Sequence, residues 1–114
     1  MNRNYVFLVL ITTVYACFSL LADTQKVGNY TWTYQINGDV AEISQYYLNG
    51  SGWQPAIAPE PTGSVAIPST LGGKPLRVIG RGAFMYCKEM SNVTIPETVT
   101  NIENYAFEYC SGLT

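Results

Sequence analysis

Residues 30–45 alternate between large apolar and polar side chains, with Asn37 and Gly38 near the middle of the run. Alternation with a period of two predicts strands that bury one face. Asn and Gly tolerate the positive φ angles that a two-residue turn requires, so the segment predicts a β-hairpin. Its expected register pairs Trp32 with Ile43 and Tyr34 with Ala41 on one apolar face.

The pattern of residues 78–90 recurs in residues 101–113, 23 positions further along the chain. Both copies keep Ile, Ala-Phe, Tyr-Cys and a closing Met or Leu, whereas the positions between them vary among polar and charged residues. A second shared element, Val-x-Ile-Pro, precedes each copy at residues 65–68 and 93–96. Fixed apolar positions with variable polar ones indicate a stacking repeat, whose fixed residues fill a shared interior.

Each unit predicts a short strand followed by a return segment. In the second unit Val93 and Ile95 alternate with polar neighbours, and Pro96 ends the strand because proline cannot donate a ladder hydrogen bond. From Ile102 the apolar spacing changes to i, i+4, i+5 and i+8, which predicts one or two helical turns.

The combined pattern, Leu/Met-x-x-Val-x-Ile-Pro, Val-x-x-Ile and Ala-Phe-x-x-Cys, resembles the BspA-like leucine-rich repeat family. The resemblance covers residues 63–114, with two copies of which the second stops at Thr114, before its next Ile-Pro strand. It implies an α/β repeat solenoid, in which short parallel strands alternate with short helical return segments and phenylalanines and cysteines form rows inside. The residues that carry it in the second copy are Met90, Val93, Ile95, Pro96, Val99, Ile102, Ala106, Phe107, Cys110 and Leu113.

The repeats are expected at residues 64–114, and an array of this kind usually needs three or more units. Two copies therefore predict an N-terminal cap, a longer parent protein, or both. The hairpin, within residues 23–48, is expected to form this cap and to cover the first repeat around Val65 and Ile67. Residues 49–63 are rich in Gly and Pro, which predicts an extended linker between cap and repeats.

Residues 1–22 are typical of a signal peptide. Arg3 gives a positive start, residues 5–22 carry no charge, and the small residue before Asp23 fits a cleavage site. The alternatives are a retained membrane anchor, because eighteen uncharged residues reach the spanning threshold, and a lipid attached to Cys17. We therefore expect a secreted or cell-surface protein that contacts a membrane only if this segment is retained.

The charge balance argues against polyanionic partners. Without the first 22 residues, which contain Arg3, five of the six basic residues remain against eight acidic ones, for a net charge of −3. Lys and Arg form no cluster in the sequence, so nucleic acid and anionic membrane surfaces are poor candidates as partners.

The chain contains no histidine, which excludes histidine-based catalytic triads and the histidine-containing zinc patterns. Cys87 and Cys110 lack a histidine to activate them, so we interpret them as small buried core residues. Stacked repeats place equivalent Cα atoms ~4.8 Å apart, which allows a Cys87–Cys110 disulfide, although the resemblance implies free thiols. No catalytic, cofactor or metal site is predicted, because the carboxylates occupy variable positions: Glu89, Glu97, Glu103 and Glu108.

The function expected from these features is that of an exported, non-enzymatic repeat protein that binds a protein or glycan on a cell surface or in a matrix. The resemblance itself implies surface adhesion. The candidate contact residues are the outward positions of the sheet face: Ser64, Ala66, Asn92 and Thr94.

The main alternative is a structural or carbohydrate-binding accessory domain of a larger secreted enzyme. In that alternative Trp53 stacks on a ligand, whereas otherwise it folds back as a local plug. Carbohydrate binding would use aromatic rings exposed on one side, drawn from Trp32, Tyr34, Tyr46, Tyr47 and Trp53. Three Asn-x-Ser/Thr sequences are candidate N-glycosylation sites, at Asn29, Asn49 and Asn92.

Overall fold

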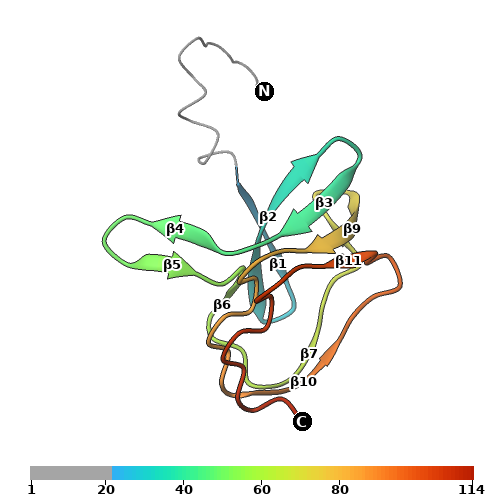
Figure 1. Cartoon of the computed structure of the whole chain (residues 1–114). Coiled ribbons are helices and arrows are strands. Elements are labelled where there is room, and N and C mark those ends of the chain that lie inside the picture. Colours follow the sequence, from blue (N-terminus) through green and yellow to red (C-terminus); the bar gives the residue numbers. More distant parts are fainter. Residues whose placement is uncertain (1–21) are drawn as a thin grey trace.

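The computed structural model describes residues 22–114, which form strands joined by turns (Figure 1). The expected signal peptide and the Cys17 alternative lie outside the described residues, apart from Ala22. The eleven strands are β1 (Asp23–Val27), β2 (Tyr30–Asn37), β3 (Val40–Ile43), β4 (Tyr46–Leu48), β5 (Gly52–Gln54), β6 (Ile57–Ala58), β7 (Gly63–Ala66), β8 (Thr70–Leu71), β9 (Lys74–Ile79), β10 (Met90–Thr94) and β11 (Asn101–Ile102).

The largest sheet joins the N-terminal strands to the repeats. Its order is β1-β2-β3-β9-β11, with β6 paired to β2 and β8 paired to β9. The pairs β1–β2 and β2–β3 are antiparallel, whereas β3–β9 and β9–β11 are parallel. Two further sheets have two strands each, β7–β10 and β4–β5, and the β4–β5 hairpin projects to the left of the molecule in Figure 1.

A hairpin forms where the sequence predicts it, from β2 and β3, but its turn is displaced. Gln35 pairs with Glu42 and Asn37 with Val40, so the turn residues are Gly38 and Asp39. The predicted pairing of Trp32 with Ile43 is therefore wrong by two residues. A shift of two keeps every side chain on its face, because side chains alternate with that period. The predicted apolar face is accordingly buried, as residues Trp32, Tyr34, Ala41 and Ile43.

The hairpin meets the first repeat through backbone pairing. Strand β3 lies beside β9, with Ala41 opposite Leu76 and Ile43 opposite Ile79. This contact lies on β9 and not on β7, where the sequence places it around Val65 and Ile67. Those two residues are buried in the same core, which consists of Trp32, Tyr34, Ala41, Ile43, Ala56, Ile57, Val65, Ile67, Leu71, Leu76, Ile79, Ala83, Phe84, Cys87, Met90 and Ala106.

Aromatic rings link the N-terminal strands to both repeats. The ring of Trp32 meets the ring of Phe84 edge to face, with centroids 5.9 Å apart. Phe84 in turn stacks on Phe107 at 5.0 Å with an interplanar angle of 3°. The two repeats therefore lie in register, with equivalent phenylalanines in direct contact.

The expected α/β repeat solenoid is wrong. Over residues 22–114 the structure contains strands and turns but no helix, and its sheets are mixed. The return segments, residues 80–89 and 103–112, are successions of tight turns. Tyr105 and Tyr109 have positive φ angles of 65° and 59°, a left-handed conformation that a right-handed helix cannot contain.

Hydrogen bonding explains why turns replace the predicted helix. The amides of Ala83, Met85 and Cys87 donate to carbonyls three residues earlier in the same segment. The intervening amides donate to the second repeat instead: Gly82 to Tyr105, Phe84 to Ala106 and Tyr86 to Glu108, at 2.8–3.1 Å. A helix satisfies its amides internally. Here alternate amides join neighbouring repeats, so the i, i+4 apolar spacing arises from a chain of turns.

No stretch among residues 22–114 is a helix long and apolar enough to cross a membrane.

Candidate functional site

The four outward positions predicted from the sequence lie together on strands β7 and β10. These strands are parallel, and Ser64 is paired with Asn92 and Ala66 with Thr94. All four side chains are exposed, while Val65 between them is buried in the core. We call this surface the β7–β10 face. Its side chains are small and uncharged, so it forms a shallow surface.

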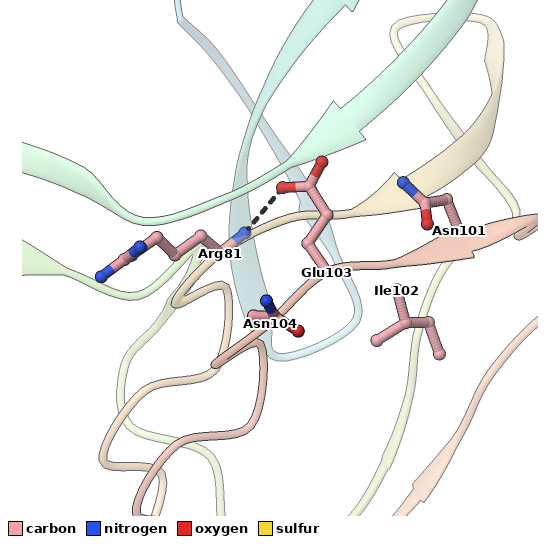
Figure 2. Close-up of a pocket in the computed structure, with 5 residues that line it drawn as sticks. All are labelled: Arg81, Asn101, Ile102, Glu103 and Asn104. Atoms are coloured by element: carbon pink, nitrogen blue, oxygen red, sulfur yellow. Dashed lines mark hydrogen bonds between the residues drawn. The ribbon is translucent and has the colours of Figure 1, made fainter.

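A recess lies at the free edge of β11 (Figure 2). It has a volume of about 430 Å³. Within it, a carboxylate oxygen of Glu103 accepts a hydrogen bond from the backbone N–H of Arg81 at 3.2 Å. The guanidinium of Arg81 points away from this carboxylate and lies 4.8 Å from the ring centroid of Tyr105. The remaining lining residues are Asn101, Ile102 and Asn104.

This recess lacks the groups needed for hydrolysis of glycosides. Glu103 is the single carboxylate among its lining residues, whereas that chemistry uses two carboxyl groups across a cleft. Within the part of the chain that the structure describes, no group of three or more Cys, Asp or Glu side chains is placed to hold a metal ion.

Cys87 and Cys110 are free thiols and are not activated as nucleophiles. Burial raises the pKa of Cys87 to about 12, with smaller contributions from nearby Cys110 and Glu60. Burial also raises the pKa of the Cys110 thiol. The Cys110 thiol donates to the carbonyl of Phe84 at 2.9 Å, which ties the second repeat to the first. Both thiols thus stay protonated at neutral pH and act as core residues.

Four of the five aromatic residues named from the sequence form two groups, and the fifth, Tyr46, is half-buried. Trp32 and Tyr34 are buried, as their alternation indicates. Tyr47 and Trp53 face solvent across the β4–β5 hairpin, where their rings meet edge to face at 5.4 Å. The interpretation of Trp53 as a local plug is wrong, because 55% of its surface is exposed.

Sequence reasoning missed a pair of stacked surface tyrosines. Tyr86 and Tyr109 lie 4.9 Å apart with an interplanar angle of 8°, and both are more than half exposed. Their backbones have the same positive φ, 59°. The signal was available: tyrosine precedes cysteine in both copies of the repeat. A hydrophobic residue kept at an exposed position is the feature that would have identified them.

The candidate glycosylation residues are all on the surface. Asn29 lies between β1 and β2, Asn49 between β4 and β5, and Asn92 on β10 within the β7–β10 face. All three side chains are exposed. A glycan on Asn92 would cover the β7–β10 face.

The two repeats pair their strands in parallel and stack their phenylalanines in register. Backbone amides of the first return segment also donate to carbonyls of the second. These features define a repeat protein whose units stack through their strands. A family model described as BspA type leucine rich repeat region (6 copies) matches residues 63–114. Residues 63–114 are therefore a BspA-type leucine-rich repeat region. Comparison with curated proteins and with solved structures found no match to this chain.

Proposed function

We propose that this chain is a non-enzymatic binding protein that acts outside the cell or on its surface, and that the β7–β10 face contacts a protein partner. Membership of residues 63–114 in a BspA-type repeat region supports a protein-binding or surface role. The observation that carries the choice of surface is the side-by-side exposure of Ser64 with Asn92 and of Ala66 with Thr94.

The shape of this face favours a macromolecule over a small ligand. Small-molecule sites are concave and bury most of the ligand, whereas the β7–β10 face is shallow. Its short side chains lose little conformational entropy when a partner covers them. The partner is expected to supply the larger anchoring side chains, which dominate binding energies at interfaces.

The chemistry of the described residues supports a binding role over a catalytic one. Glu89, Glu97 and Glu103 are exposed at variable repeat positions. The thiol of Cys87 is buried, and burial raises its pKa to about 12, so it is a poor nucleophile at neutral pH.

Matched arginine substitutions test the proposed surface. Thr94→Arg places a long charged side chain in the β7–β10 face, while Thr24→Arg places the same change on an exposed position of β1. Binding of the labelled chain is measured on intact cells and on surfaces coated with extracellular matrix proteins. We expect Thr94→Arg to reduce binding on the order of tenfold and Thr24→Arg to leave it unchanged.

Two results would contradict this proposal. One is equal binding by the two variants, which would place the contact elsewhere. The other is a folded protein that adheres to none of these surfaces. Circular dichroism and thermal melting establish that both variants are folded before binding is compared.

A further inference from the structure

A second recess lies between the β4–β5 hairpin and the return segment of the first repeat. Its volume is about 430 Å³, within the range of small-ligand sites. Three stretches of the chain build it: the hairpin, strand β6 with the residues after it, and residues 85–87. Its lining residues include Tyr46, Trp53, Gln54, Ile57, Glu60 and Tyr86.

Trp53 gives this recess a flat aromatic wall. Its ring meets Tyr47 at an interplanar angle of 78°, so at least one face of the indole is free of that contact. The buried Ile57 also lines the recess. Trp53 and Tyr86 are both more than half exposed and both line the recess, and exposed aromatic surface of this kind marks ligand sites.

The polar groups of the recess favour an uncharged ligand. Glu60 is the one formally charged residue among its lining residues, and its carboxylate accepts hydrogen bonds. The phenols of Tyr46 and Tyr86 can both donate and accept. The negative charge of Glu60 disfavours the binding of an anionic ligand. The ammonium of Lys88 lies 5.9 Å from the ring centroid of Tyr86, and its positive charge disfavours the binding of a cationic ligand.

The spacing of the rings also argues against a cage for a quaternary ammonium group. Such cages enclose the cation within ~6 Å of each ring centroid. Here Trp53 packs on Tyr47 and Tyr86 stacks on Tyr109, so the rings on the two sides of the recess are held by different partners. The space between them is larger than one ammonium head group requires.

We propose that this recess binds a neutral carbohydrate. A pyranose ring has an apolar face of C–H groups, which packs on the free face of Trp53, and a rim of hydroxyls, which donate to Glu60 and exchange hydrogen bonds with the phenols of Tyr46 and Tyr86. The site is independent of the β7–β10 face, since the two share no residue. Loss of one function therefore leaves the other intact.

Tryptophan fluorescence provides a direct measurement, because the chain contains two tryptophans and Trp32 is only 1% exposed. The probes are cellohexaose, laminarihexaose, chitohexaose and maltohexaose. We expect at least one of them to change the emission saturably, and isothermal titration calorimetry to give its dissociation constant.

Three variants assign the binding to this recess. Trp53→Ala removes the aromatic wall and is expected to weaken binding roughly tenfold or more by calorimetry. Glu60→Gln keeps the side-chain shape and removes the charge, and is expected to weaken it severalfold. Leu48→Ala, on the same hairpin but outside this recess, serves as the control and should bind like the unaltered chain.

Several outcomes would overturn the proposal. One is that none of the hexasaccharides binds the folded chain at millimolar concentration. Another is that Trp53→Ala and Glu60→Gln both bind like the unaltered chain. Displacement of a bound hexasaccharide by tetramethylammonium at equimolar concentration would instead assign the recess to cations. Because Glu60 is exposed, Glu60→Gln stays informative even if Trp53→Ala disturbs the hairpin.

Discussion

The two repeats have the same pattern of apolar residues but very different surroundings. The first repeat lies between the N-terminal strands and the second repeat, whereas among the described residues the second is covered on one side alone. Ile79 in the first is fully buried, and its equivalent Ile102 is 47% exposed. The repeat pattern thus fixes where a side chain points. The neighbours decide whether that side chain is buried.

Some sequence differences between the repeats reflect the fact that the first is packed on both sides and the second on one side. Gly80 is equivalent to Glu103, and a Cβ atom at Gly80 would lie 2.9 Å from the carbonyl oxygen of Ile43. Gly82 is equivalent to Tyr105, and both have a φ of 65°. The first repeat therefore has glycine where residues 43–45 approach closely, and the second has larger side chains at the same positions.

Backbone hydrogen bonds join the return segment of the first repeat to the structure on both of its sides. The carbonyls of Arg81 and Ala83 accept from the amides of Gln45 and Ala56, on the N-terminal side. The amides of the same return segment donate to the second repeat, including Phe84 to Ala106 at 2.8 Å. The first repeat is therefore bonded on both sides, which makes it the centre of the fold.

The largest expected effect comes from the stacked phenylalanines. Phe84→Ala should lower the free energy of unfolding by about 3–5 kcal/mol, because it empties a fully buried site. Phe107→Ala should cost roughly half as much, since Phe107 is only partly buried. Urea denaturation of the two variants, followed by circular dichroism, measures both values.

Equal losses in the free energy of unfolding for Phe84→Ala and Phe107→Ala would contradict the claim that packing on both sides distinguishes the first repeat from the second. Phe84→Leu serves as the control, since it retains most of the buried volume and should lose less than Phe84→Ala.

An intermediate effect is expected at Gly80. Gly80→Ala should destabilise the fold by about 1–3 kcal/mol, because the new methyl group meets the Ile43 carbonyl and the Ser44 side chain at 2.9 Å. Glu103→Ala, at the equivalent position, should destabilise the fold by about 1 kcal/mol or less, because it removes one exposed hydrogen bond, from the Arg81 amide. Thermal melting of both variants checks the comparison. A Gly80→Ala variant as stable as Glu103→Ala would show that the N-terminal strands can move away.

The apolar alternation of residues 30–45 was sufficient to predict a hairpin and its buried face. It did not fix the turn, because Asn37-Gly38 and Gly38-Asp39 both place a glycine where a positive φ is needed. The faces survived the error because the two registers differ by a whole side-chain period.

The 23-residue period predicted that equivalent phenylalanines stack, and they do. It could not predict the conformation of the return segments. An i, i+4 spacing is shared by a helix and by a chain of tight turns, and the hydrogen bonds that distinguish them are made to another repeat. The pairing of β3 with β9 was missed for a similar reason, since it depends on strands far apart in the sequence.

The candidate contact residues were easier to place than the aromatic recess. Ser64, Ala66, Asn92 and Thr94 follow from alternation within one strand type, and the structure pairs them as expected in neighbouring parallel strands. Whether they bind a partner stays a prediction. The recess beside Trp53 joins three separate stretches of the chain, which no local pattern brings together.

The smallest expected effect is a difference between the two cysteines in how stability falls between pH 8.5 and 10. The pKa of Cys87 is raised from 9.0 to about 12, chiefly by burial, so the native state holds its proton through a range in which the unfolded chain releases it. The contribution of the Cys87 thiol to the free energy of unfolding is therefore fully present below pH 9. It declines between pH 9 and 12, by up to ~1.4 kcal/mol per pH unit.

Replacing each cysteine with alanine isolates its contribution to this decline. Cys87→Ala should flatten the fall in unfolding free energy between pH 8.5 and 10 more than Cys110→Ala does, because Cys87 is 1% exposed and Cys110 only partly buried. Iodoacetamide at pH 8 provides an independent measurement, in which Cys110 should be modified before Cys87. Equal slopes together with equal rates of modification would mean that the second repeat protects its cysteine as well as the first. The difference in burial between the first and the second repeat would then not extend to the sulfur atoms of Cys87 and Cys110.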